Sequence, residues 1–121
     1  MNPADLFRRD NEALSLATGD YLFREQEPGD KMYVLLEGEM DILVGALLVE
    51  TAQRGALLGE MALIDNSPRT ASAVARTACR LAPIDQKRFH FLVQQTPNFA
   101  THVMKVLAGR LRRMNEMAAA R

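Results

Sequence analysis

The segment from residue 58 to residue 71 combines a carboxylate, a guanidinium and the start of a short helix. Glu60 begins a run long enough for one or two helical turns, and the first turn of a helix presents unpaired backbone N–H groups and a positive dipole end. Residues 66–68, Asn-Ser-Pro, are expected to break that helix, because proline cannot continue it and the residue before proline leaves the α region. Arg69 follows, and its planar guanidinium can bind a phosphate through two hydrogen bonds. A carboxylate suits a sugar hydroxyl instead, so the segment predicts a site for a phosphorylated sugar.

Two runs in this segment, with the spacing between them, carry a family resemblance; they read GEMAL at residues 59–63 and PRTA at residues 68–71. They closely resemble the phosphate-binding cassette of the cyclic nucleotide-binding domain family. That family includes transcription regulators related to the catabolite activator protein, regulatory subunits of cyclic-nucleotide-dependent kinases, and gated ion channels. The resemblance extends from about Ala17 to the C-terminal helix. Leu58 departs from the pattern, since many members have an aromatic residue there.

The resemblance implies a role for the polar residues of the cassette. Family members use the carboxylate at the position of Glu60 on the ribose hydroxyl, and the arginine at the position of Arg69 on the cyclic phosphate. Backbone N–H groups near residues 60–62 assist that arginine. Without the resemblance, Glu60 would be an exposed carboxylate near a helix N-terminus and Arg69 an ordinary surface arginine. The ligand-binding residues expected in the cassette are Gly59, Glu60, Met61, Ala62, Arg69, Thr70 and Ala71.

Three residues bear on the base of the nucleotide. A hydroxyl at the position of Thr70 can contact guanine in this family, but cyclic AMP binders also carry Thr or Ser there, so both ligands stay open. Ile42 aligns with an apolar wall beside the base, and it reads equally well as a core strand residue. Arg110 lies on the last helix, where family members place a side chain that covers the base. Its guanidinium would stack on a purine; the alternative is a solvated helix face.

The composition is that of one soluble domain, with 121 residues of which 48% are hydrophobic and 25% charged. The formal net charge is zero, so no global basic field attracts nucleic acid. The single cysteine, Cys79, excludes an internal disulfide and fits a reducing compartment. The N-terminal residues lack the features of a signal peptide, and no apolar run is long enough to span a bilayer. We therefore expect a soluble cytoplasmic protein without a membrane segment.

Short apolar runs separated by turn residues predict a mainly β fold with flanking helices. The expected strands are residues 21–23, 32–36, 40–44, 47–51, 70–75 and 79–84, with a tight hairpin at residues 45–46. The resemblance implies a roughly eight-stranded jelly roll, a short helix in the cassette and two C-terminal helices. The expectation is one cyclic nucleotide-binding domain over residues 1–121, with an N-terminal segment 1–14, a β roll 15–84 and helices 85–121.

Two helices are expected to close the chain. Asp85 is the predicted N-cap of the first. Thr96 as N-cap and Pro97 at the first helical position predict the start of the second. The second helix carries an apolar stripe that makes a homodimer through this helix plausible; it consists of Phe99, Val103, Val106, Leu107, Leu111, Met114 and Met117.

The leading interpretation is a stand-alone or excised sensor that binds cyclic AMP or cyclic GMP, needs no other cofactor and signals to an unknown downstream protein. Binding would pull the cassette inward and shift the C-terminal helices as a population shift between two helix positions. The expected mechanical link is Leu63 or Ile64 against an apolar residue of the first helix, namely Phe89, Phe91 or Leu92.

Three other functions compete with the sensor interpretation. An enzyme is one, because cupins share the jelly roll and hold a metal, but no expected strand carries a His and no nucleophile–base pair is visible. A DNA-binding regulator would need a reading helix and a basic domain, so no nucleic acid contact is expected from this chain alone. A ligand-free domain used for protein contacts is disfavoured by the intact Glu60 and Arg69.

Overall fold

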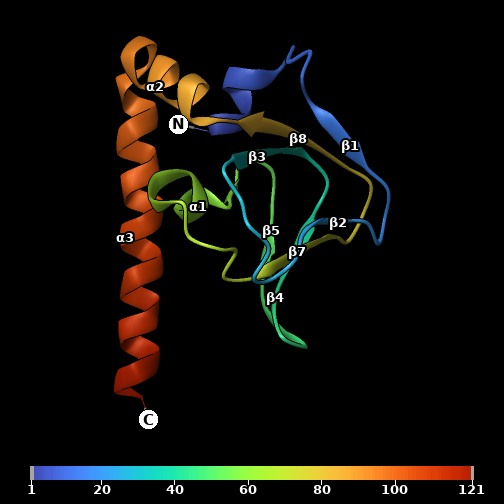
Figure 1. The fold of residues 1–121 in the computed structure, drawn as a ribbon, viewed down its shortest axis with the longest axis vertical. Helices are drawn as coiled ribbons and strands as arrows, with labels where there is room; N and C mark the ends of the chain where they lie inside the picture. The colour runs from blue at the N-terminus through green and yellow to red at the C-terminus, as the bar shows by residue number, and fades with distance from the viewer. Residues whose placement is uncertain (1, 121) are drawn as a thin grey trace.

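A computed structural model describes residues 2–120, so Met1 and Arg121 at the ends of the expected domain lie outside the described residues. The strands and helices follow one another along the chain (Figure 1). In order they are a 3-10 helix η1 (Pro3–Phe7), the strands β1 (Leu14–Leu16), β2 (Tyr21–Phe23), β3 (Met32–Glu37), β4 (Met40–Val44), β5 (Leu47–Ala52) and β6 (Leu57–Leu58), helix α1 (Glu60–Asp65), strands β7 (Ser72–Ala75) and β8 (Cys79–Ile84), and helices α2 (Gln86–Gln95) and α3 (Pro97–Ala119).

The strands form two four-stranded antiparallel sheets. One has the order β1-β8-β3-β6 and the other β2-β7-β4-β5. Strands that are neighbours in a sheet are often far apart in sequence, which is typical of a jelly roll and separates it from a simple meander. The expected fold class, a mainly β jelly roll with two C-terminal helices, is confirmed.

The side chains of β3 point alternately to its two faces and so belong to two separate cores. Met32 and Val34 face the helices, in a cluster that also contains Phe7 of η1, Leu63 of α1 and Phe99 of α3. Leu35 points the other way, because successive side chains of a strand alternate, and lies in the core between the two sheets. One strand therefore connects the inside of the β roll to the helical layer that covers it.

The helices lie on one side of the roll, with α1 between α3 and the strands (Figure 1). Asp85 caps α2 as predicted, since its side chain accepts a hydrogen bond from the backbone of Arg88 at 2.8 Å. Thr96 occupies the N-cap position of α3 and Pro97 the first turn, but the Thr96 side chain makes no capping hydrogen bond. Within residues 2–120, no helix is both long and apolar enough to cross a membrane.

The sequence missed two strands and misplaced the start of a third. β1 and β6 have three and two residues, too few for a visible alternation. β7 begins at Ser72 rather than at residue 70, because the cassette occupies the two preceding residues. The mixed-charge N-terminal segment forms η1, whose Phe7 is buried against the helical core.

Of the alternative apolar contacts predicted between the cassette and α2, the structure contains those of Leu63. Leu63 lies in the same cluster as Phe89 and Leu92, as the proposed link requires. Ile64 and Phe91 are instead 52% and 59% exposed and take no part in it. The apolar stripe of α3 is likewise divided, since its first four members belong to the helical core while the last three, Leu111, Met114 and Met117, are exposed.

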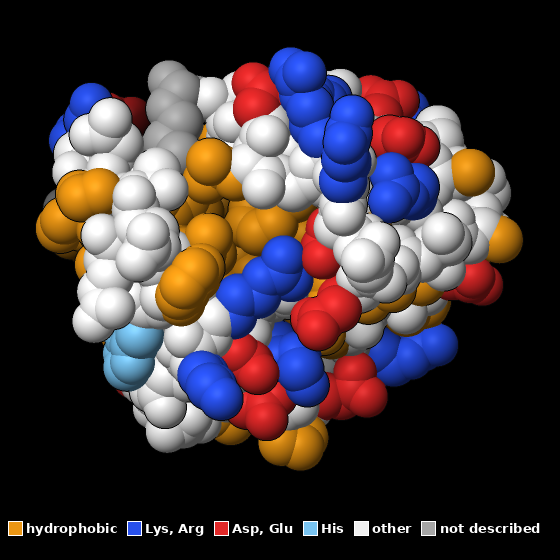
Figure 2. All heavy atoms as spheres, turned by 90° about the horizontal axis from the view of Figure 1, so that it is seen from above, with side chains coloured by type: hydrophobic (Ala, Val, Ile, Leu, Met, Phe, Trp, Pro, Cys, Tyr) orange, Lys and Arg blue, Asp and Glu red, His pale blue; other side chains and the backbone are white. Residues whose placement is uncertain are grey.

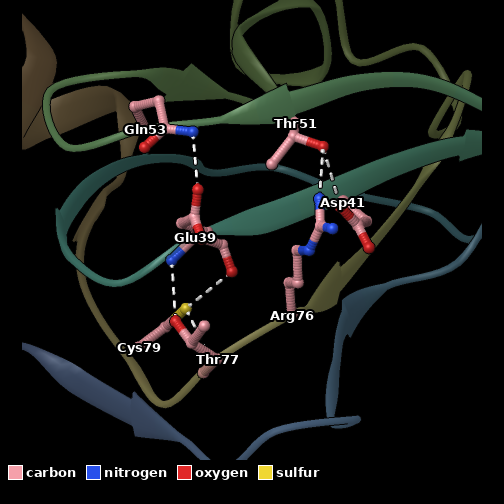
Figure 3. Close-up of polar contacts among 7 residues, drawn as sticks. All are labelled: Glu39, Asp41, Thr51, Gln53, Arg76, Thr77 and Cys79. Carbon is pink, nitrogen blue, oxygen red and sulfur yellow. Dashed lines mark hydrogen bonds and ion pairs between the residues drawn. The ribbon is translucent and has the colours of Figure 1, made fainter.

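Polar contacts tie the base of the β4–β5 hairpin to the β7–β8 turn (Figure 3). Thr77 Oγ1 accepts a hydrogen bond from the backbone N–H of Glu39 at 3.0 Å, and Gln53 Nε2 donates to Glu39 Oε2 at 2.7 Å. Arg76 Nη1 lies 3.8 Å from Asp41 Oδ1. These contacts fix β4 and β5 relative to β7, and so position the inner face of that sheet.

Candidate functional site

The backbone of Arg69 is held against the loop that joins β2 to β3. Its N–H donates to Glu27 O at 2.9 Å, and its carbonyl accepts from the N–H of Gln26 at 2.8 Å. Gln26 has a positive φ of 69°, so this loop turns sharply where the two segments meet. The cassette arginine is therefore anchored by backbone hydrogen bonds before its side chain makes any contact.

The guanidinium of Arg69 is buried but poorly provided with hydrogen-bond partners. The residue is 6% exposed, its Cζ lies 4.3 Å from the ring centre of Phe23, and its Nη1 donates to Gly59 O at 3.1 Å. Its Nε has no hydrogen-bond partner among the described residues. Burial lowers the pKa of this guanidinium, while Tyr33, Asp30 and Glu27 oppose that shift. A buried cation with unused donors is suited to a buried anion.

Two glycines make the space for this guanidinium. A Cβ atom on Gly29 would collide with Arg69 Cζ, and one on Gly59 would collide with Arg69 Nη1. Gly59 also has a φ of 75°, in the left-handed region that favours glycine, and it directly precedes α1. Gly29 has no such backbone requirement, so only the close approach of the arginine calls for glycine at that position.

This difference makes Gly29→Ala a selective probe of the site. The added methyl group should push the guanidinium of Arg69 aside without straining the backbone. We expect affinity for a phosphate-bearing ligand to fall by at least about tenfold, which corresponds to losing one charge-assisted hydrogen bond. The thermal midpoint should change by only a few degrees. Titration calorimetry and thermal melting check the two halves separately, and an unchanged affinity would show that Gly29 is not needed for the site.

Glu60 begins α1 with its carboxylate buried and is 2% exposed. The guanidinium of Arg110, on the middle of α3, donates from Nη1 to Glu60 Oε1 and from Nη2 to Leu57 O at 2.9 Å. Burial lowers the pKa of Arg110, and Glu50 opposes this shift. The cassette and the C-terminal helix are thus connected by an ion pair between residues fifty positions apart. The structure brings Arg110, predicted as a residue that covers the base, into contact with Glu60 of the cassette.

The remaining predicted site residues differ in how deeply they are buried. Ala62 is buried and Ala71 half-buried, whereas Thr70 is exposed and Met61 is 45% exposed. Ile42 is half-buried and packs against the core between the sheets. The sequence interpretation missed three residues around Arg69, namely Phe23, Gly29 and Tyr33, although a glycine after Pro28 was visible as a turn signal.

One cavity lies away from the cassette, between η1, the end of β8 and α2. It has a volume of about 740 Å³, and Figure 2 views this end of the molecule, where hydrophobic side chains lie among basic and acidic ones. Arg88 in its wall is paired with Asp10 at 3.1 Å and lies over the ring of Phe7. Arg88 and Asp10 therefore neutralise each other in this cavity wall. In the cassette, by contrast, the buried Arg69 keeps an Nε without a hydrogen-bond partner among the described residues. Among residues 2–120, no cluster of His, Cys, Asp or Glu could hold a metal ion.

Comparison with known sequences identifies relatives of this chain. A family model described as the cyclic nucleotide-binding domain matches residues 13–96. A CRP-like cAMP-activated global transcriptional regulator of Mycobacterium tuberculosis is 31% identical over 106 residues, covering 84% of this chain and 47% of the regulator. The cGMP-dependent protein kinase egl-4 of Caenorhabditis elegans is 33% identical over 93 residues, covering 70% of this chain and 12% of the kinase. The chain therefore spans about half the length of the mycobacterial relative and a smaller part of the kinase.

Solved structures agree with the sequence relatives. The catabolite activator protein of Thermus thermophilus matches with a TM-score of 0.77 at 26% identity, over 85% of this chain and 51% of that protein. A structure described under a cyclic-GMP-dependent signalling pathway that regulates bacterial phytopathogenesis also has a TM-score of 0.77, at 25% identity over 90% of both chains. With the family model matching most of its length and its cassette folded around Glu60 and Arg69, the chain belongs to the cyclic nucleotide-binding domain family.

Proposed function

We propose that this chain is a sensor module that binds cyclic AMP or cyclic GMP, with Arg69 on the cyclic phosphate and Glu60 on the ribose hydroxyls. The observation that carries the proposal is the buried Arg69 guanidinium, whose Nε lacks a hydrogen-bond partner among the described residues. A phosphate would supply both the missing acceptor and the missing negative charge. The recognition of phosphate and sugar is a binding task, so we infer that the module is not an enzyme. A sensor of a nucleotide made inside the cell would act in the cytoplasm.

The ion pair between Glu60 and Arg110 suggests how binding would move the helices. A ribose hydroxyl that donates to the Glu60 carboxylate competes with the arginine of α3 for the same oxygen atoms. The cassette also reaches α2 through Leu63, which shares a core cluster with Phe89 and Leu92. Both contacts would change the equilibrium between two positions of the C-terminal helices, which is a population shift. Spin labels at positions 37 and 116 should change their separation when nucleotide is added, and a constant separation would contradict this mechanism.

A calorimetric titration of nucleotide-stripped protein with cyclic AMP, and then with cyclic GMP, tests the binding proposal. We expect at least one of the two to bind with a dissociation constant in the micromolar range or below. If neither binds, the sensor assignment is wrong, and a ligand-free domain used for protein contacts becomes the better explanation of the fold.

A second candidate is that the module is the sensor part of a longer transcription regulator. The similarity to the mycobacterial regulator over 84% of this chain favours it. Expression of the full open reading frame followed by a DNA-binding assay with and without cyclic nucleotide would test this role, and DNA binding that ignores the nucleotide would count against it.

The exposed side of α3 supports a homodimer. Met104, Leu111 and Met114 are each at least 60% exposed and recur at the spacing of a coiled-coil seam, seven and three residues apart. Leu111→Glu places a charge in this seam and is expected to shift the protein from dimer to monomer in light scattering after gel filtration. Asn115→Glu adds the same charge at an exposed position beside the seam and serves as the control. A wild-type monomer would contradict the proposal.

A further inference from the structure

One row of side chains crosses all four strands of the second sheet on its inner face. Phe23 of β2 pairs with Ala73 of β7, Ala73 with Ile42 of β4, and Ile42 with Glu50 of β5. Directly paired residues of adjacent strands share a face. The first three contact the core between the sheets, and Glu50 lies two residues from the buried Ala52, which belongs to the same core. Glu50 therefore points toward the interior of the roll.

The two ends of this row carry opposite charges. At one end, the guanidinium of Arg69 lies over the ring of Phe23 at 4.3 Å. At the other end is the carboxylate of Glu50. Three strand spacings separate the backbones of Phe23 and Glu50 by about 14 Å, and the guanidinium of Arg69 lies over the Phe23 end of this row. A nucleotide whose phosphate lies at Arg69 would extend its base along Ala73 and Ile42 toward Glu50.

The carboxylate of Glu50 has free acceptor capacity. It lies 4.0 Å from Arg110 Nη2 and 3.9 Å from Arg113 Nη2, which are ion-pair distances too long for hydrogen bonds. Among the described residues, its side chain accepts no hydrogen bond. Glu50 and Arg110 also line a hollow of about 260 Å³ between α3 and the β5–β6 connection. The two carboxylate oxygens of Glu50 are therefore available to a ligand. They lie beside Arg110, which also contacts the carboxylate of Glu60.

A carboxylate distinguishes the two purines by their hydrogen-bonding edges. Guanine presents two adjacent donors, N1–H and the N2 amino group, which match the two oxygens of a carboxylate. Adenine presents one donor, the N6 amino group, beside the lone pair of N1, which would face a carboxylate oxygen and be repelled. We propose that Glu50 accepts hydrogen bonds from N1 and N2 of guanine and makes this module selective for cyclic GMP over cyclic AMP. This inference rests on the proposed function, because it requires a cyclic nucleotide in the cassette.

Titration of the wild type and of Glu50→Gln with both nucleotides tests the assignment. We expect the wild type to bind cyclic GMP about tenfold to a hundredfold more tightly than cyclic AMP, the discrimination typical of one bidentate contact. Glutamine offers one acceptor and one donor and so matches adenine, which should remove or reverse that preference. Glu37→Gln loses the same charge at an exposed position paired with Arg80, and it should leave the preference unchanged.

A second measurement needs no variant and so does not depend on the folding of Glu50→Gln. Inosine 3′,5′-cyclic monophosphate keeps the N1–H of guanine and lacks the N2 amino group. The wild type should bind it about tenfold more weakly than cyclic GMP, since one of the two hydrogen bonds is lost. Equal affinity for these two ligands would overturn the bidentate contact.

The outcomes separate the two proposals. If the wild type binds both nucleotides but prefers cyclic AMP, or if Glu50→Gln keeps the preference for cyclic GMP, the role of Glu50 is wrong while the proposed function stands. Selectivity that disappears in Thr70→Ala but persists in Glu50→Gln would assign the reading of guanine to the cassette instead. If neither nucleotide binds, the proposed function fails and the selectivity fails with it.

Discussion

Replacing Arg69 with alanine is expected to weaken cyclic nucleotide binding by at least about a hundredfold. A guanidinium–phosphate pair makes two charge-assisted hydrogen bonds, each worth about 1.5–3 kcal/mol, and every 1.4 kcal/mol corresponds to a factor of ten. The loss should be large because the site is buried, so water cannot replace the arginine at little cost. Titration calorimetry measures this difference directly.

The same substitution should leave the fold about as stable in the absence of nucleotide. Arg69 makes one side-chain hydrogen bond, to Gly59 O, and holds a desolvated charge whose Nε is unpartnered among the described residues. Removing the arginine relieves the cost of burying its charge, and this gain about equals the free energy that is lost with its contacts. We expect the free energy of unfolding from urea titration to change by less than about 1 kcal/mol.

Two further variants sharpen this test. Arg69→Lys keeps the charge and loses the planar fork, so it should recover only part of the binding. Arg80→Ala removes a half-buried arginine of β8 that is paired with Glu37, and serves as the control for the loss of a positive charge. If Arg69→Ala bound cyclic nucleotides as tightly as the wild type, the assignment of the phosphate site would be wrong.

Local signals were sufficient for the parts of this fold that depend on neighbouring residues. The cassette helix ends at Asp65, directly before the break predicted at residues 66–68, Asp85 caps α2, and the hairpin at residues 45–46 connects β4 and β5, all as the sequence predicted. In each case the turn or cap is determined by residues that lie within three or four positions of it in the sequence. The cassette itself was visible because its glycine, carboxylate and arginine occur in one segment.

Contacts between distant segments could not be read in the same way. Nothing local indicates that Arg110 would pair with Glu60, or that Phe23 would lie beneath the guanidinium of Arg69. Gly29 looked like an ordinary turn residue, because the arginine that requires the space is forty positions away. Glu50 was hidden for a similar reason, since its inward direction follows from the register of β5 with β4, and a shift of one residue would reverse it.

Under the proposed function, the position of Arg110 would connect ligand recognition to the stability of the helical layer. Its guanidinium holds the buried carboxylate of Glu60 and a backbone carbonyl of β6, so one side chain of α3 contacts both the cassette and the β roll. A nucleotide that engages Glu60, as proposed above, would therefore act on the same contact that fastens α3. Under that proposal, sensing and helix position would be linked because both depend on the Glu60 carboxylate.

Replacing Arg110 with methionine is accordingly expected to lower the free energy of unfolding by about 3 kcal/mol without nucleotide. Methionine preserves most of the packing of the arginine stem but leaves Glu60 buried without its cationic partner, and breaking a buried pair from one side typically costs 3–5 kcal/mol. We place the cost at about the lower end of that range, because the Arg110 side chain is 29% exposed. Urea denaturation followed by circular dichroism measures the loss.

Matched variants separate the ion pair from general effects on α3. Arg113→Met removes a neighbouring arginine whose one ion pair among residues 2–120 is a long one to a half-exposed carboxylate, so it should cost less than about 1 kcal/mol. Glu60→Gln combined with Arg110→Met removes both charges and should recover much of the lost stability, since no unpaired charge remains. Equal effects of Arg110→Met and Arg113→Met would show that the pair does not fasten α3.

Nucleotide should rescue the Arg110→Met variant more than it stabilises the wild type. In the variant, the ribose hydroxyls would give Glu60 the donors that it has lost, whereas in the wild type they compete with a donor already present. Ligand that binds the folded state raises the melting temperature in proportion to its binding free energy. At saturating nucleotide we therefore expect a larger rise in melting temperature for Arg110→Met than for the wild type. A smaller rise would mean that Arg110 assists the bound ligand, by covering its base, more than it competes with it.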